Sequence, residues 1–375
     1  MEREELAAWL RLTLTPGIGD RAARQLLAAF GLPRNIFAQP VDALGQLVSL
    51  SQARALLAPP DGLDAQLEAV SNWLASAEPP SSRHVLTLAD AGYPPGLLDT
   101  ADPPVLLYVQ GELPAEWPAA VAVVGSRNPT PQGLLNARQF ARCFAQAGLT
   151  VVSGLALGVD GAAHEGALEG AAPGSLATVA VVGTGLDRVY PRQHLELAHR
   201  IAERGLMISE YPLGTPPLAP NFPRRNRIIS ALTQGTLVVE AALKSGSLIT
   251  AGQAAEQGKE VFAIPGSIHS PQSRGCHALL KQGAKLVESA QDVLEELHSS
   301  GHRAAARAQA STEAARQSPE DALLRALGFD PVSVDALVAR TGVAPADLQA
   351  QLLEFELQGE VARLPGGLFQ RISAG

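Results

Sequence analysis

Short apolar segments alternate with helical segments through the middle of the sequence, and this alternation limits the possible folds more than any other feature. The apolar segments are continuous and rich in β-branched residues, which is the pattern of strands buried on both faces. They are Val121–Val124, Thr150–Ser153, Thr178–Val182, Leu206–Ser209, Thr236–Val239 and Val261–Ile264. The helical segments between them are Gly133–Ala147, Val159–Glu169, Gln193–Arg204, Arg225–Leu232 and Ser247–Gln257. This order predicts a Rossmann-like α/β fold with a doubly wound, mostly parallel sheet.

The segments on either side of the α/β region differ from it in composition. We predict a helical domain in residues 1–80, the Rossmann-like domain in 81–298, a flexible linker in 299–318 and a winged-helix domain in 319–375. The linker contains no large apolar residue, so it cannot bury a face.

The N-terminal helical domain contains two glycines, Gly17 and Gly19, between two helical segments. This arrangement resembles a helix-hairpin-helix (SAM-like) domain, in which glycines allow a tight turn and Asp20 would cap the second helix. Exposed amides of such a turn can hold a DNA phosphate, and the alternative is a helical pair that only packs.

The C-terminal domain follows the order of a winged helix-turn-helix. Helices are expected at Glu320–Leu327, Ser333–Arg340 and Ala346–Gln358, before a hairpin that turns at Gly366-Gly367. The domain carries four basic and eight acidic residues, and its last helix contains Asp347, Glu354 and Glu356. Because carboxylates repel phosphates, we predict that this domain binds protein rather than duplex DNA.

Composition excludes several other classes of protein. The two cysteines, Cys143 and Cys276, form no CxxC pair, which argues against a disulfide framework or a structural zinc site and fits the cytoplasm. The charged start, Met1–Glu5, is unlike a signal peptide, and no apolar run is long enough to span a membrane. The formal net charge is −8, so any nucleic-acid site must be a local cluster of basic residues.

Ligands of doubly wound sheets bind at the carboxyl ends of the strands, so the loops that follow the strands carry the candidate site. Glycines let the backbone approach a phosphate, helix N-termini supply amides, and arginines can clamp the oxygens. Phe222 lies beside three arginines and adds a surface on which a base can stack. Phosphate contacts combined with base stacking are typical of proteins that bind single strands. The expected nucleic-acid-binding residues are Gly125, Ser126, Arg127, Ser153, Gly154, Gly158, Asn221, Phe222, Arg224, Arg225, Asn226, Arg227, Lys244, Ser245, Gly246 and Ser247.

Several polar residues near these loops have a structural alternative. Arg227 falls within a predicted helix, so its side chain is at least as well suited to a structural salt bridge as to a contact with ligand. Asp160 and His164 lie four apart on a helix, which favours a satisfied polar pair over catalysis. Glu240, at a strand end, is expected to anchor backbone rather than act as a general base. We therefore predict no catalytic residue, no metal site and no cofactor.

The loops occur together in an order that resembles the DNA-processing protein A (DprA/Smf) family. The motifs are Gly125-Ser126-Arg127, Ser153-Gly154 with Gly158-Val159-Asp160 and Ala163-His164, Ser209-Glu210-Tyr211-Pro212, Phe222 to Ile229, and Lys244 to Ser247 with Thr250-Ala251. The resemblance is dense over residues 85–297 and looser in the terminal domains.

The resemblance implies a protein of natural transformation that protects incoming single-stranded DNA and loads the RecA recombinase on it. It also implies homodimerisation through the Rossmann-like domain and no enzymatic turnover. The sequence departs from the family pattern at Ala219, where some relatives have lysine, and at His277, where the pattern has asparagine. The first departure removes a possible phosphate contact, and the second alters the region of the implied dimer.

Two enzyme classes remain as alternatives. The core is also similar to lysine-decarboxylase-like phosphoribohydrolases, which cleave nucleoside monophosphates and use a Pro-Gly-Gly-x-Gly-Thr-x-x-Glu motif. Here Gln234 to Glu240 lacks the Pro-Gly-Gly lead, and the acid falls one residue later, on the other face of a strand. A dinucleotide oxidoreductase is disfavoured because no GxGxxG opens the first helix. ATP hydrolysis is not expected, because the sequence has no Walker motif.

Overall fold

The computed structural model describes all residues except 78–80, 298–322, 325, 329 and 372–375. The chain divides into two compact units. One unit is Ala69–Ala304, and the other combines Met1–Glu68 with Ala305–Gly375. The predicted linker, residues 299–318, lies outside the described residues, as does the start of the predicted helix Glu320–Leu327.

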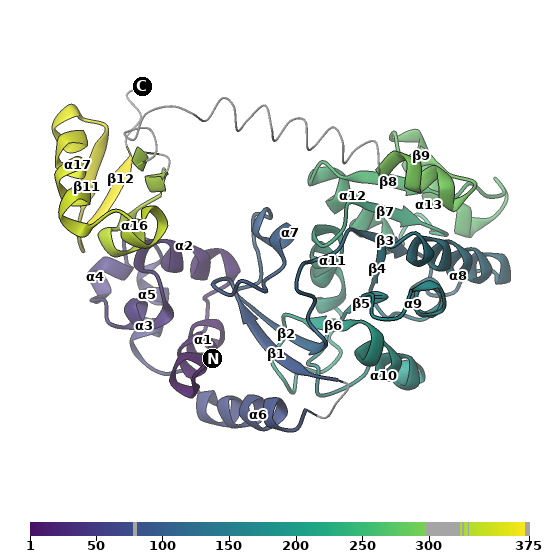
Figure 1. The fold of residues 1–375 in the computed structure, drawn as a ribbon, viewed down its shortest axis with the longest axis horizontal. Helices are drawn as coiled ribbons and strands as arrows, with labels where there is room; N and C mark the ends of the chain where they lie inside the picture. The colour runs from purple at the N-terminus through teal and green to yellow at the C-terminus, as the bar shows by residue number, and fades with distance from the viewer. Residues whose placement is uncertain (78–80, 298–322, 325, 329, 372–375) are drawn as a thin grey trace. The chain divides into compact units, whose positions relative to one another are not determined.

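The N-terminal region is helical, as predicted (Figure 1). Its helices are α1 (Arg3–Leu14), α2 (Asp20–Phe30), α3 (Pro33–Phe37), α4 (Val41–Leu44), α5 (Leu50–Leu57) and α6 (Leu63–Ala75). Gly17 turns the chain after α1 with a φ of +80°, a conformation that favours glycine. The N-cap of α2 is Gly19 rather than Asp20, which is the first helical residue, so the capping prediction is wrong.

Within the described residues the main sheet has nine strands in the order β1-β2-β6-β5-β4-β3-β7-β8-β9. The strands are β1 (Arg83–Thr87), β2 (Leu106–Gly111), β3 (Ala120–Val124), β4 (Thr150–Ser153), β5 (Thr178–Val181), β6 (Leu206–Ser209), β7 (Gly235–Val238), β8 (Glu260–Ala263) and β9 (Lys285–Leu286). Strands β3 to β9 pair in parallel, and β2 pairs antiparallel with β6 and β1. The predicted doubly wound, mostly parallel sheet is confirmed.

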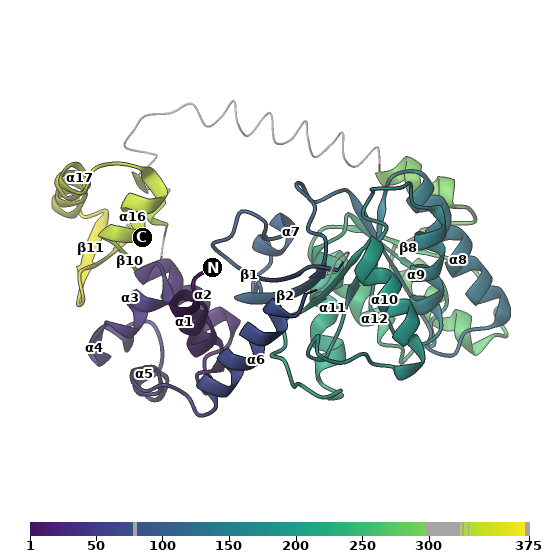
Figure 2. The same ribbon diagram turned by 60° about the horizontal axis from the view of Figure 1, so that its bottom comes forward.

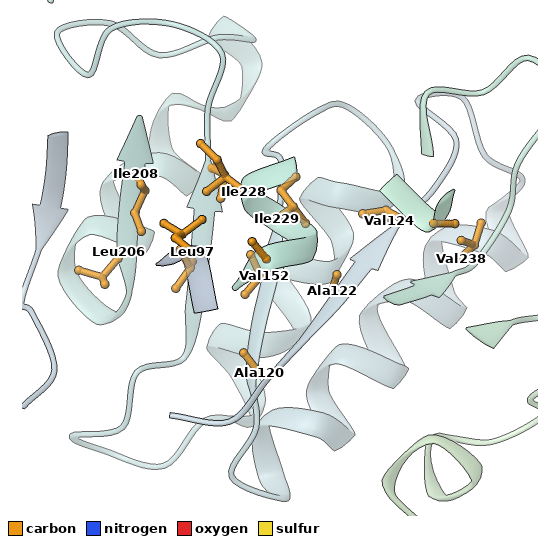
Figure 3. Packing of buried hydrophobic residues seen from close by; sticks show 14 of the residues in the cluster. Leu97, Ala120, Ala122, Val124, Val152, Leu206, Ile208, Ile228, Ile229 and Val238 are labelled. Atoms are coloured by element: carbon orange, nitrogen blue, oxygen red, sulfur yellow. The ribbon is translucent and has the colours of Figure 1, made fainter. Parts of the chain in front are cut away.

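Successive residues of each strand face opposite layers of helices, which explains why the strands are apolar throughout. In β3, Ala120, Ala122 and Val124 join one hydrophobic cluster, whereas Val121 and Val123 join the other. Figure 3 shows the first cluster, in which Ile228 and Ile229 of α11 lie among strand residues. The helices and turns of this unit are α7 (Pro95–Leu98), α8 (Pro131–Gln146), α9 (Val159–Gly170), η1 (Arg192–His194), α10 (Leu195–Arg204), α11 (Asn221–Ala231), α12 (Ser247–Glu256), η2 (Pro271–Ser273) and α13 (Arg274–Lys281).

The order of the strands sets the position of the candidate site. From β3 the chain adds β4, β5 and β6 on one side, and then returns to place β7 on the other side of β3. The direction of winding therefore reverses between β3 and β7, where the loops after the two strands diverge and leave a crevice for ligands. Figure 2 shows the helices that pack around this sheet from a second side.

The C-terminal region has the predicted winged-helix elements. Strand β10 (Val332–Ser333) precedes α16 (Val334–Thr341) and α17 (Pro345–Gln358), and β11 (Val361–Leu364) and β12 (Leu368–Arg371) form the wing. Three residues, Pro365 to Gly367, connect β11 to β12, and both Gly366 and Gly367 have positive φ, a conformation that favours glycine. No helix among the residues that the structure describes is long and apolar enough to cross a membrane.

Candidate nucleic-acid interface

A cavity of about 510 Å³ opens where β3, β4 and β7 end. Three loops, one side of α11 and the start of α12 line it, so segments that are far apart in the sequence meet at the predicted edge of the sheet. The predicted residues that line it are Gly125, Ser126, Arg127, Phe222, Arg225, Asn226, Lys244, Ser245, Gly246 and Ser247. The sequence did not single out Asn128 and Thr250 as candidate ligands, yet both also line it.

The exposed part of the lining combines cations with an aromatic ring. Arg127 and Lys244 are both exposed, and they come from the loops after β3 and β7. The Arg127 guanidinium carbon lies 5.6 Å from the centre of the half-buried Phe222 ring, within range of a cation–π contact. This arrangement offers a positive charge for a phosphate beside an apolar surface for a base.

The β3–α8 loop, which carries Arg127, is anchored at its far end by Glu240. The Glu240 carboxylate accepts hydrogen bonds from the Thr130 backbone N–H at 2.9 Å and from the Thr130 hydroxyl at 2.6 Å. Thr130 in turn caps α8 by accepting from the Gly133 N–H. Glu240 is therefore a backbone anchor, as predicted, and its anchoring fixes the loop that presents Arg127.

The β4–α9 loop is organised differently, because its polar groups bond to one another. Asp160 Oδ2 accepts from the backbone N–H groups of Gly154 at 3.1 Å and Ala156 at 3.3 Å. Leu155 has a φ of +58°, in the left-handed region that an L side chain rarely adopts. Burial raises the pKa of Asp160, and the charge of Arg225 opposes that rise.

The residues of this loop that were predicted to bind ligand instead make hydrogen bonds and packing contacts within the protein. The Ser153 side chain is fully buried, and its hydroxyl donates to the Val123 carbonyl at 2.7 Å. The Gly154 N–H donates to the Asp160 carboxylate, and the Gly154 carbonyl accepts from Arg225 Nη1. Gly158, with a φ of +81°, lies so close to the Ser126 carbonyl that a Cβ there would be 2.5 Å from it. Packing explains why glycine occupies positions 154 and 158. Neither these two glycines nor Ser153 lines the cavity.

Arg225 borders the cavity, but its guanidinium is buried against backbone. It donates to the carbonyls of Gly154 at 2.5 Å and Val181, and its Nη2 lies 3.9 Å from Asp160 Oδ2. A Cβ on Gly154 would lie 2.0 Å from that same Nη2. Burial lowers the pKa of Arg225 to about 10, with the Asp160 charge opposing the shift. The predicted role of Arg225 as a phosphate clamp does not match this placement, because the side chain is buried and its Nε and Nη1 donate within the protein.

The three arginines of α11 separate because the helix begins at Asn221, earlier than predicted. Helical geometry sends consecutive side chains about 100° apart, so neighbours in sequence face different surroundings. Arg227 is buried and bonds to Glu210, while its Nε lies 3.2 Å from Asp102 Oδ2. Its structural alternative, the salt bridge, is thus confirmed. Arg224 remains 53% exposed, with Nη2 3.8 Å from Glu210 Oε2.

The amides of α11 tie the cavity walls together. Asn226 Nδ2 donates to the Gly246 carbonyl at 3.3 Å, and its Oδ1 accepts from Arg225 Nε at 3.1 Å. Asn221 Nδ2 donates to the Gly183 carbonyl at 3.0 Å, so Asn221 braces the loop after β5 and does not line the cavity. The two hydroxyls of the β7–α12 loop, on Ser245 and Ser247, lie 2.7 Å apart.

Asp160 and His164 do not form the polar pair that their spacing predicts. Asp160 bonds to loop amides, whereas His164 Nδ1 lies 2.7 Å from the Thr178 hydroxyl. Burial, assisted by the charges of His194 and Arg225, lowers the pKa of His164 to about 3. His164 is therefore neutral at ordinary pH. No three His, Cys, Asp or Glu side chains within the described ranges gather in a way that could hold a metal ion.

Comparison with protein families identifies the domains. The sequence model of DNA recombination-mediator protein A matches residues 84–298, and that of the DprA winged helix domain matches residues 305–367. The chain belongs to the DprA/Smf family. Protein Smf of Escherichia coli strain K12 is 43% identical over 325 residues, which cover 85% of this chain and 84% of that protein. The DNA processing protein DprA of Streptococcus pneumoniae is 46% identical over 210 residues, covering 56% of this chain and 73% of the relative.

Solved structures of the DprA/Smf family have the same architecture. DNA processing protein A from Streptococcus pneumoniae matches with a TM-score of 0.65 and 36% identity, covering 79% of this chain and 98% of that one. The Helicobacter pylori protein, described for its single-stranded DNA binding mode, matches with a TM-score of 0.51 and 32% identity. That match covers 58% of this chain and 97% of the other.

Proposed function

We propose that this DprA/Smf protein binds single-stranded DNA without sequence preference along the exposed strip formed by Arg127, Phe222, Arg224 and Lys244. The observation that carries the proposal is the cation–π contact between Arg127 and Phe222 at the mouth of the cavity. Such a pair can clamp a phosphate and stack on the adjoining base, and stacking tolerates any sequence because every base has a π-face. The similarity to the Helicobacter pylori protein, which binds single-stranded DNA, supports the same ligand here.

We further propose that the bound strand is incoming DNA in natural transformation, which the protein protects and passes to the RecA recombinase in the cytoplasm. The support is the family description as a DNA recombination mediator. A protein with this task must release its strand, so moderate affinity and strong salt dependence suit it. Purified protein should accelerate RecA filament formation on single strands coated with a single-strand-binding protein, and no acceleration would refute this step.

The proposed activity is binding without turnover. The phosphoribohydrolase alternative needs a free acid near the ligand, but both Glu240 oxygens accept hydrogen bonds from Thr130. No observation favours that alternative over binding.

We propose that two copies pair through the Rossmann-like domain. Two exposed apolar residues support this: Leu286 in β9, the last strand of the sheet, is 54% exposed, and Ile268 in the loop after β8 is 74% exposed. His277, which replaces the family asparagine, is turned to the Gly266 carbonyl at 3.0 Å. Sedimentation should show a dimer that Ile268→Glu converts to monomer, and an unchanged dimer would place the interface elsewhere.

A titration with three ligands tests the proposed function. Fluorescence anisotropy should show tight binding of single-stranded oligonucleotide, weaker binding of the matched duplex, and little binding of a mononucleotide. Tight mononucleotide binding with release of free base would instead establish the hydrolase.

A further inference from the structure

The loop between β5 and η1 carries an exposed aromatic residue that lies against the proposed DNA-binding strip. Tyr190 is 46% exposed, and its ring centre lies 5.6 Å from that of Phe222, with the ring planes inclined by 40°. We propose that Tyr190 is a second stacking surface, which binds the base of the nucleotide next to the one on Phe222. The inference rests on the proposed function and extends the strip beyond the cavity, whose lining does not include Tyr190.

The order of groups on this surface suits consecutive nucleotides of a single strand. Arg127 lies over Phe222, and Phe222 in turn contacts Tyr190. Phe222 also approaches the backbone at Gly183, where a Cβ would lie 3.2 Å from Phe222 Cδ1. One side of the phenyl ring is thus supported by main chain. The result is a run of cation, ring and ring, the combination that holds single strands in other proteins.

The spacing of the two rings decides how bases can use them. A base inserted between them would need about 7 Å, twice the stacking distance of roughly 3.4 Å. The rings are closer than that, at 5.6 Å between centres. Each ring must therefore offer its outer surface to a different base, and Tyr190 is not the second wall of a sandwich around one base.

Several hydrogen bonds hold the loop that presents Tyr190. The Gly183 carbonyl accepts from Asn221 Nδ2 at 3.0 Å, and the Thr184 carbonyl accepts from Ser209 Oγ at 2.6 Å. Asp187 Oδ1 accepts from the Gly214 N–H at 2.7 Å. A ring on a loop fixed in this way loses little conformational freedom when a base stacks on it.

Substitution of Tyr190 in two backgrounds tests the inference. Tyr190→Ala should weaken binding of an oligothymidine by at least about fivefold, the lower end of what stacking contributes. Tyr190→Phe should bind like the wild type, since the ring and not the hydroxyl acts. Tyr190→Ala combined with Phe222→Ala should bind more weakly than Phe222→Ala alone. Against an oligonucleotide whose central nucleotides are abasic, wild type and Tyr190→Ala should bind equally.

A matched control is Leu98→Ala, which removes a side chain of similar exposure, 42%, on α7. Helix α7 packs at the opposite end of α11 from Phe222, where Gly96 meets the Ala231 carbonyl. Unchanged affinity in Tyr190→Ala would overturn the inference, and so would the absence of any added loss in the Phe222→Ala background, which would make Tyr190 only a support for Phe222. If the wild type binds no single strand, or Arg127→Ala binds as tightly as the wild type, the proposed function fails instead.

Discussion

The β3–α8 and β4–α9 loops are both rich in glycine and both precede a helix, yet they do different work. The first exposes Arg127 over Phe222. The second uses its amides to bind Asp160 and its Gly154 carbonyl to bind Arg225. A buried polar group must be bonded, so a loop whose donors and acceptors are satisfied internally has few left for a ligand.

The same contrast runs along α11. Arg224 is 53% exposed, whereas the next residue, Arg225, is buried and donates to the Gly154 carbonyl of the β4–α9 loop. Adjacent residues of one type therefore belong to the proposed DNA-binding strip and to the core beneath it. What separates them is the direction in which the helix sends each side chain. Substitutions can distinguish the exposed group from the buried one.

The largest expected effect is on stability, from removal of Arg225. Arg225→Ala leaves the Asp160 charge buried without its partner, which costs about 3–5 kcal/mol. The free energy of unfolding, measured in urea, should fall by that amount, and DNA affinity should fall with it. Arg224→Ala is the matched control and should unfold within about 0.5 kcal/mol of wild type. Equal stability of the two variants would contradict the assignment.

The next effect is on affinity, from removal of the ring in the strip. Phe222→Ala should lose about 1–3 kcal/mol of binding free energy for single-stranded DNA. Because the ring is uncharged, the slope of affinity against salt should change little. Phe222→Leu, which keeps the bulk without the π-face, controls for packing. A large change in the salt slope of Phe222→Ala would mean that the ring acts by placing Arg127.

A smaller effect on stability is expected from pH, through His164 of α9, the helix that follows the β4–α9 loop. His164 has its pKa lowered to about 3 by burial, against 6.5 ordinarily. Below pH 6.5 His164 is protonated in the unfolded chain but stays neutral in the folded chain. The free energy of unfolding therefore decreases as the pH falls from 6.5 towards 3. His164→Gln should lose less stability than wild type between pH 7 and pH 5 in urea unfolding. An identical loss in both proteins would show that His164 titrates normally.

The smallest effect, on DNA affinity, is expected from the acidic winged helix. Deletion of residues 319–375 should leave single-strand affinity unchanged within about twofold, because Asp347, Glu354 and Glu356 on α17 oppose phosphate binding. Anisotropy titration of the truncated and full-length chains measures this. A collapse of affinity would assign a DNA contact to the domain.

The sequence predicts the parallel core well, because its strands are continuous apolar runs between helical segments. Strands β3 to β8 lie within one residue of their predicted bounds. The sequence pattern does not predict β1 and β2, since they pair antiparallel outside the strand–helix repeat. In the site, Arg127, Phe222 and Lys244 line the cavity as expected.

The misplaced site residues have a common cause. Their positions in the sequence predict that Arg225, Arg227 and Ser153 contact ligand, but their side chains point into the protein. Sequence order indicates which loop carries a residue, whereas burial depends on the exact helix start and on partners such as Glu210. No sequence pattern singles out the Tyr190-Pro191 segment, which lies nine residues after the end of β5, and only its contact with Phe222 reveals it.

The most direct test of DNA binding by the exposed strip is the salt dependence of single-strand affinity in wild type and Arg127→Ala. We predict an affinity lower by about 1.5–3 kcal/mol in the variant, because a charge-assisted bond to phosphate is lost. We also predict a slope of log affinity against log salt that is shallower by about 0.7, the value for one phosphate contact on a single strand. An unchanged affinity and slope would contradict the claim that the exposed loop after β3 grips the DNA backbone.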